Sequence, residues 1–165
     1  MLEKIKNLIE STVGEGTVLG DMDNAWEYGF EIMPNKIKEV CFLLRDSENT
    51  YFDMLSCITG LDDMPNEDTL EVAYNLYSLP YKQKLVLKVK LLRETDKGNL
   101  PIIDSVCEVW ATANWLEREV YDLMGINFQG HPDLRRILLP TDWNGYPLRK
   151  DYQLQEYYHG VKVEY

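Results

Sequence analysis

The sequence predicts an α+β fold: an open mixed or antiparallel sheet with helices packed on one face, followed by an extended irregular C-terminal segment. Three observations predict it. Residues 69–79 and 84–92 alternate apolar and polar side chains, as strands with one buried face do. Apolar residues recur at helical spacing near the N-terminus and before Gly125. Residues 126–165 follow neither period, so we expect a domain at 1–125 and an extended segment at 126–165.

The N-terminal elements follow from spacing and from turn residues. Residues 2–13 have the pattern of an amphipathic helix that ends at Gly14. Residues 17–33 fit two short strands around a turn at 21–24. Pro34 and Asn35 then open a second helix. The apolar face of this helix consists of Ile37, Val40, Cys41 and Leu44.

Three further strands are expected in the middle of the chain. The first, at residues 51–59, is separated by a polar turn at 62–66 from the second, at 69–79. We expect Phe52, Met54 and Ile58 on one side of the first strand. Residues 84–92 give the clearest pattern of all. Its inward side chains are Leu85, Leu87, Val89 and Leu91, and its outward ones are Lys84, Lys88 and Lys90.

A last helix is expected before Gly125, which suits the left-handed position just past a helix end. Ser105 and Glu108 have capping-box spacing, although the pattern lapses at 111–113 and predicts a break there. The apolar stripe consists of Leu116, Val120, Leu123 and Met124.

Charge and composition exclude several classes of protein. The net charge of −11 argues against binding nucleic acid, whose phosphates would repel the chain. All of that excess lies in residues 1–72, with 5 basic and 16 acidic side chains, whereas residues 73–165 have 12 of each. The acidic part is either a solvated face or a sign that the neutral part lies against something else. The sequence has no stretch of about 20 apolar residues and no signal peptide, so we expect a cytoplasmic location.

Residues that could bind a metal or act in catalysis are sparse. Cys41, Cys57 and Cys107 are far apart and set among apolar neighbours, so we interpret them as buried rather than as metal or cluster ligands. His131 with Asp133 could form a base and its orienting group, but no nucleophile lies nearby in the sequence.

The last helix carries several charges. Glu117 and Glu119 point about 200° apart around a helix axis, so they do not form one paired site. Arg118 and Asp122 are spaced to form an ion pair within the helix.

The C-terminal segment is rich in aromatic residues, which a disordered tail would lack. Such a segment lies along another protein or wraps back over its own domain, and composition leaves both open.

Three blocks within residues 116–154 resemble the signature region of the 30 kDa-type subunit of proton-pumping NADH:quinone oxidoreductase, or respiratory complex I. The first block contains Glu117, Arg118, Glu119, Tyr121, Asp122 and Gly125. The second runs from Gly130 to Leu138 and contains His131, Asp133, Arg135 and Arg136. The third runs from Pro147 to Tyr152 and contains Arg149, Lys150 and Asp151.

The resemblance implies a cofactor-free structural subunit without catalytic, cofactor-binding or metal-binding residues. Such a subunit lies in the hydrophilic arm of the complex, peripheral to the cytoplasmic side of the membrane. It docks the hydrogenase-like, quinone-site subunit beside other hydrophilic-arm subunits, and so supports electron transfer from NADH to quinone coupled to proton translocation.

On this basis we expect Arg135, Arg136 and Arg149 to dock the quinone-site subunit, while an Arg118–Asp122 pair and Glu119 brace the last helix. The alternatives are an equivalent subunit of a ferredoxin- or hydrogenase-linked membrane complex, or a free-standing enzyme that uses His131, Asp133 and Arg135.

Overall fold

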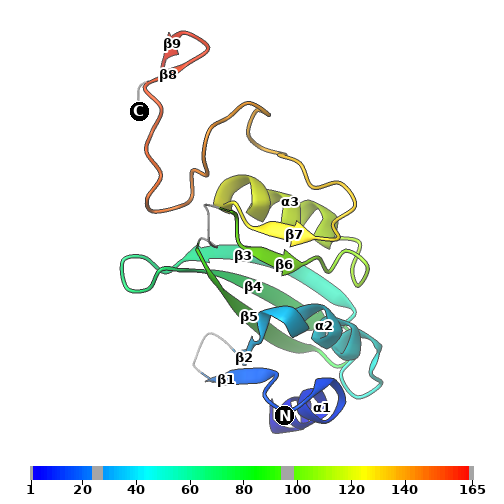
Figure 1. Cartoon of the computed structure of the whole chain (residues 1–165). Helices are drawn as coiled ribbons and strands as arrows, with labels where there is room; N and C mark the ends of the chain where they lie inside the picture. Colours follow the sequence, from blue (N-terminus) through cyan, green and yellow to red (C-terminus); the bar gives the residue numbers. More distant parts are fainter. Residues whose placement is uncertain (1, 24–27, 94–98, 164–165) are drawn as a thin grey trace.

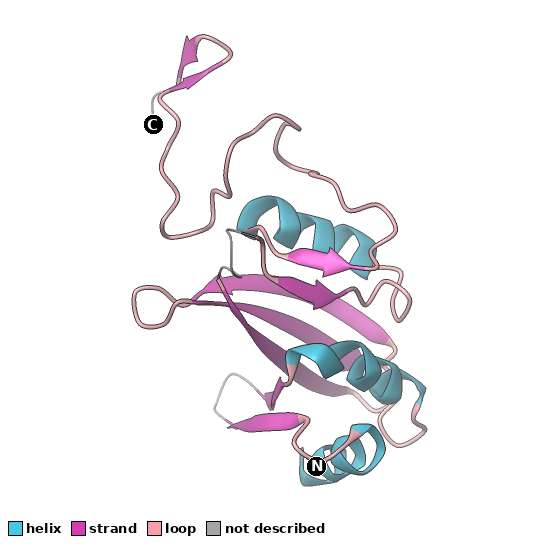
Figure 2. Cartoon of the chain, in the orientation of Figure 1, coloured by secondary structure: helices cyan, strands magenta, loops and turns pink. Residues whose placement is uncertain are grey.

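The computed structural model describes residues 2–23, 28–93 and 99–163, and its main feature is a five-stranded sheet (Figures 1 and 2). The strands lie in the order β1-β2-β5-β4-β3. Their bounds are β1 Val18–Asp23, β2 Tyr28–Ile32, β3 Met54–Asp62, β4 Thr69–Ser78 and β5 Gln83–Leu92. Neighbouring strands are antiparallel except β2 and β5, which are parallel. The predicted open mixed sheet is therefore confirmed.

Three α-helices pack against one face of this sheet in a single hydrophobic core. They are α1 Leu2–Val13, α2 Ile37–Asp46, which follows a short 3₁₀ turn η1 at Pro34–Lys36, and α3 Ala113–Met124. The four inward residues predicted for β5 are all buried. Helix α3 lies on β3 at Gly60, where a side-chain Cβ would come within 2.8 Å of Met124. The prediction of an α+β layer with helices on one face is thus confirmed (Figure 2).

The chain leaves the sheet through two small additions. Strands β6 (Ile102–Asp104) and β7 (Asn127–Gln129) form a parallel pair beside α3, on either side of it in the sequence. After β7 the chain has no regular structure until the short hairpin of β8 (Tyr157–Tyr158) and β9 (Val161–Lys162). This hairpin stands away from the sheet, as Figure 1 shows. None of the described helices has the length and apolar character needed to cross a lipid bilayer.

The predicted phase of β3 is wrong at its start. Met54 is 43% exposed, whereas Phe52 and Ile58 are buried, so the three do not share one side. The pairing of β3 with β4 shifts between Leu55 and Cys57, which is a β-bulge. A bulge inserts one residue and reverses the alternation of faces, so Leu55 takes the buried place expected of Met54.

Three local predictions also need correction. The turn expected at 21–24 does not begin at Asp21, because β1 continues to Asp23; Asn24 lies outside the described residues. Helix α3 begins only at Ala113, because the Ser105 hydroxyl bonds to the Glu117 carboxylate instead of capping a helix. Of the cysteines, Cys41 is buried, Cys107 is half-buried and Cys57 is exposed on the outer face of the sheet.

Candidate functional site

The family-like charges gather where α3 meets the segment that follows β7. Asn114, Arg118, Asp122 and Gly125 follow one another at steps of four, four and three residues, which places them along one side of a helix and its end. We call residues 131–151 the strap. The strap contacts these four positions in the same order as they occur along α3, so it runs along the helix in the helix's own direction.

The first attachment of the strap is His131. Its Nε2 lies 3.0 Å from the carbonyl oxygen of Asn114, and its Nδ1 accepts the backbone N–H of Asp133 at 2.9 Å. This pattern defines a neutral ring that accepts at Nδ1 and donates at Nε2. Both nitrogens are therefore used in holding the strap to the start of α3.

Arg118 forms the second attachment. Its guanidinium donates to the backbone carbonyls of Arg135 and Arg136, each at 3.1 Å, while its other side lies over the Trp115 ring at 5.3 Å. The side chain is almost fully buried, and hydrogen bonds satisfy buried donors that would otherwise destabilise the fold. The predicted Arg118–Asp122 pair is wrong, because Arg118 turns outward to the strap backbone.

Asp122 forms the third attachment and is fully buried. Its Oδ2 accepts the backbone N–H groups of Ile137, Leu138 and Leu139 at 3.0, 2.7 and 2.8 Å. Its Oδ1 pairs with Arg136 at 2.7 Å. Burial alone would raise the pKa of Asp122, but the hydrogen bonds from these backbone groups and Arg136 outweigh it and hold the pKa below its ordinary value.

Arg136 also fixes the next turn of the strap. The same guanidinium donates to the Asp122 carbonyl at 2.9 Å and to the carbonyls of Trp143 and Gly145, both at 3.0 Å. Its carbon centre lies 5.3 Å from the Tyr146 ring. Arg136 therefore joins α3 to two places in its own segment.

The end of α3 forms the fourth attachment. Arg149 donates to the carbonyls of Met124 and Gly125 at 2.7 and 3.1 Å, which are free because a helix leaves its last carbonyls unpaired. Its guanidinium lies 5.0 Å from the Tyr146 ring, on which Arg136 also stacks. Gly125 has φ +67°, which confirms the predicted left-handed cap.

A fifth attachment lies at the far end of the sheet. Lys150 donates its backbone N–H to Asp62 at 2.8 Å, and Asp151 pairs with Arg93 at 3.1 Å. Arg93 is buried and also pairs with Asp62 and Asp68. Burial would raise the pKa of Asp62, but hydrogen bonds from Lys150, Met64 and Arg93 lower it below its ordinary value.

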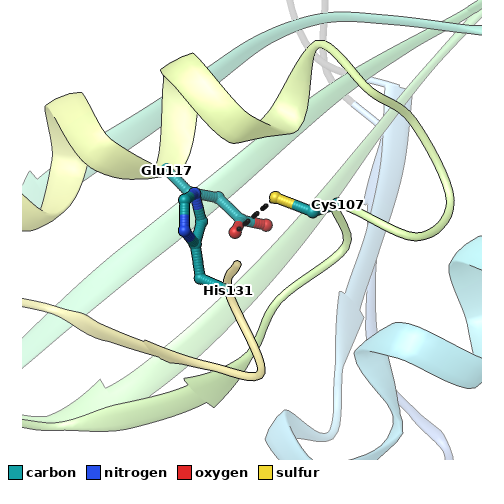
Figure 3. Close-up of side chains that lie close together, drawn as sticks. All are labelled: Cys107, Glu117 and His131. Atoms are coloured by element: carbon teal, nitrogen blue, oxygen red, sulfur yellow. Dashed lines mark hydrogen bonds between the residues drawn. The ribbon is translucent and has the colours of Figure 1, made fainter. Parts of the chain in front are cut away.

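Glu117 lies beneath the strap, next to Cys107 and the ring of His131 (Figure 3). Its two carboxylate oxygens accept the Ser105 hydroxyl at 2.6 Å and the Val106 N–H at 2.7 Å. Burial raises the pKa of Glu117, although these hydrogen bonds oppose the shift. Burial also raises the pKa of the Cys107 thiol to about 12, so the thiol stays protonated and 3.4 Å from Glu117.

These three side chains are of the types that bind zinc. Their candidate ligand atoms all lie within 4.8 Å of one another. However, both oxygens of Glu117 and both nitrogens of His131 already have hydrogen-bond partners. A metal ion would have to displace these bonds and ionise Cys107, so the arrangement fits a hydrogen-bonded brace better than a metal centre.

The remaining predicted residues lie outside the attachments. Arg135 pairs with Asp133 at 2.9 Å, and both side chains are more than half exposed. Glu119 is exposed, and no hydrogen bond or ion pair joins it to another described residue, so the structure gives it no bracing contact. A catalytic role for His131, Asp133 and Arg135 gains no support, because His131 is occupied with backbone groups.

Sequence reasoning missed Asp62 and Arg93. Asp62 stands among other acidic residues in a turn, and Arg93 ends a strand rich in lysines, so local pattern does not distinguish them. Their importance depends on the path of the strap, which returns to the sheet about 88 residues later in the sequence.

The fold and these attachments define a class of protein: an α+β domain that carries its own fastened C-terminal extension. The chain belongs to the family of the 30 kDa subunit of the respiratory-chain NADH dehydrogenase, whose family model matches residues 30–158. It is 45% identical over 153 residues to an NADH-quinone oxidoreductase subunit of Chloroherpeton thalassium, covering 91% of this chain and 61% of that protein.

Two further comparisons extend this result. The NADH-quinone oxidoreductase subunit of the same name from Chlorobium phaeobacteroides is 45% identical over 138 residues, covering 82% of this chain and 80% of that protein. A chain in the structure of the membrane-bound sulfane sulfur reductase, an archaeal respiratory membrane complex, is similar with a TM-score of 0.73 and 23% identity. That match covers 92% of this chain and 85% of the other, and it shows a shared fold.

Proposed function

We propose that this chain is a cofactor-free structural subunit of a complex I-type NADH:quinone oxidoreductase. In this role it docks the hydrogenase-like, quinone-site subunit, beside other hydrophilic-arm subunits, on the cytoplasmic side of the membrane. It supports electron transfer from NADH to quinone, coupled to proton translocation, without contributing catalytic residues. Membership of the family supports a place in such a complex, and the fastened strap supports a structural role.

The observation that carries the proposal is how the charged residues of α3 are used. Arg118 and Asp122 bond to backbone groups of the strap, and their donors and acceptors point at the chain itself rather than into an open pocket. Groups used in this way hold a segment in place and are not free to move protons or bind substrate. Docking by Arg135 remains open, because its side chain is 69% exposed.

An equivalent subunit of a related membrane complex with another electron donor remains the second candidate. The shared fold with a chain of the sulfane sulfur reductase complex favours it, because the same scaffold then serves more than one machine. The genes beside this one in its source genome would separate the two: those for an NADH-oxidising module favour the first candidate.

Removal of the C-terminal segment tests the structural role. A chain that ends at Gly130 should still fold, because the core residues precede this point, but it should no longer co-purify with the membrane complex. NADH:quinone reductase activity of the membranes should fall in proportion to the loss of assembled complex, which native gels would quantify. The Glu119→Ala variant of the whole chain is the matched control and should assemble normally.

Full assembly of the truncated chain would contradict docking through this segment. A variant that assembles normally and yet blocks turnover would instead indicate a direct part in the quinone reaction.

A further inference from the structure

The strap is held by its backbone, and this has a consequence for the side chains that it carries. Arg118 contacts two strap carbonyls, Asp122 contacts three strap N–H groups, and Arg149 returns to the carbonyls at the end of α3. A segment whose backbone polar groups face the helix turns many of its side chains away from it. The leucines of the C-terminal segment show this: Leu138 is 62% exposed, Leu148 is 58% exposed and Leu154 is 67% exposed.

Exposed leucines held on an ordered backbone differ from exposed leucines on a mobile tail. Leu138 donates its N–H to Asp122, and Leu148 donates its N–H to the Leu123 carbonyl at 3.1 Å. Both side chains are therefore presented from fixed points on α3 while remaining in water. Apolar side chains fixed at the surface in this way are typical anchors of protein interfaces.

The polar groups nearby are already used within the chain. Arg136 and Arg149 are both directed at carbonyls of their own segment and at the Tyr146 ring. The expectation that they dock a partner through charge is hard to combine with these contacts. What the strap offers outward is chiefly apolar, and it lies in the electrically neutral part of the chain, residues 73–165.

We infer that α3 orders the strap in the free subunit, and that Leu138 and Leu148 then form a preformed apolar docking surface for a neighbouring protein of the complex. The inference rests on the proposed function and deepens it. It assigns docking to outward leucines and assigns Arg118, Asp122, Arg136 and Arg149 to positioning. The partner is a protein with apolar recesses that receive these side chains. Binding then costs little ordering of this segment, because the attachments have already fixed it.

The first arm of the test concerns order in the free subunit. Hydrogen exchange of the isolated full chain should show the amides of residues 137–139 protected at least about tenfold relative to an unstructured peptide. The Asp122→Asn and Arg136→Met variants should lose this protection. The Glu119→Ala variant changes a charge on the same helix outside the attachments and should keep it. Protection of the β4 and β5 amides checks that each variant remains folded.

The second arm concerns the partner. The Leu138→Ser/Leu148→Ser double variant should keep protected strap amides and yet compete at least about tenfold less well for incorporation into the membrane complex. The Leu19→Ser variant, at an exposed leucine on β1, is the matched control and should compete like the wild type.

Each contrary outcome has a distinct meaning. Unprotected strap amides in the free wild-type chain would overturn the preformed surface, as would normal competition by the leucine double variant. Concentration-dependent dimers that the leucine substitutions abolish would show that a second copy, and not a partner protein, covers the surface. If the wild-type chain itself does not enter the complex, the proposed function fails, whatever the exchange data show.

Discussion

Gly125 combines two requirements at the point where α3 ends and the strap returns. Its φ of +67° is a conformation that side chains disfavour, and a Cβ there would come within 2.6 Å of the Tyr146 ring. Tyr146 in turn lies against both Arg136 and Arg149. The lack of a side chain at one residue therefore allows an aromatic ring and two guanidinium groups to pack over the helix end.

Gly125→Ala should consequently destabilise the chain more than Gly130→Ala. Gly130 has φ +83°, but nothing lies within 4 Å of its would-be Cβ. Both variants incur the left-handed penalty of about 1–2 kcal/mol, and only Gly125→Ala adds an overpacking cost of about 1–3 kcal/mol. Urea unfolding of the two variants and the wild type measures the difference. Equal losses would mean that Tyr146 does not pack against Gly125 in solution.

Glu117 makes folding depend on pH. Burial raises its pKa in the folded protein above the ordinary value of 4.5, so the folded state holds the proton more tightly than the unfolded state. This contribution to stability is fully present below about pH 4.5 and is lost as the pH rises through the raised pKa. The hydrogen bonds from Ser105 and Val106 reduce the effect without cancelling it.

The Glu117→Gln variant should remove this dependence, because glutamine has nearly the same shape and does not ionise. Relative to the variant, the wild-type melting temperature should fall as the pH rises from 4 to 8. Melting curves at several pH values measure this, with Glu119→Gln as the control on the exposed side of α3. A difference that does not change with pH would show that Glu117 keeps its ordinary pKa in the folded chain.

At the scale of elements, what the sequence could predict depended on how local the cause was. Strand β5 was predicted with its faces correct, because alternation is a property of the strand itself. The bulge in β3 could not be predicted, because it arises from pairing with β4. The late start of α3 was missed for a similar reason, since the Ser105 hydroxyl bonds to Glu117, 12 residues away.

The attachments of the strap follow the same rule. The sequence identified Arg118, Asp122, Arg136 and Arg149 as a group, but the pairing that it predicted within α3 does not occur. Residues four apart on a helix can pair, yet such a pair stabilises by only about 0.2–0.5 kcal/mol. A buried carboxylate gains more from several backbone N–H groups and an arginine, which only the returning strap supplies.

At the scale of the whole molecule, the strap is fixed at two places that are far apart in the fold. One is the set of contacts with α3, and the other joins Asp151 and Lys150 to Arg93 and Asp62 at the end of the sheet. Two attachments of one segment support each other, because either one keeps the segment close to the other. The extension is therefore held to the domain more firmly than each contact would suggest.

We therefore expect the Arg136→Met/Asp151→Asn double variant to release the strap far more than the sum of its single variants. Both substitutions lie in the strap, so they leave the core of the domain unchanged, and the three N–H groups still bond to Asp122 in each single variant. In Asp151→Asn the α3 contacts still hold the strap, and the loss should be within about 1 kcal/mol, as for a partly exposed ion pair. Limited trypsin digestion of the four chains, followed as cleavage after Lys150 and Arg135, measures strap opening while the intact domain serves as the internal standard. Independent attachments would give cleavage rates whose changes simply multiply, and that result would refute mutual support between the two ends of the strap.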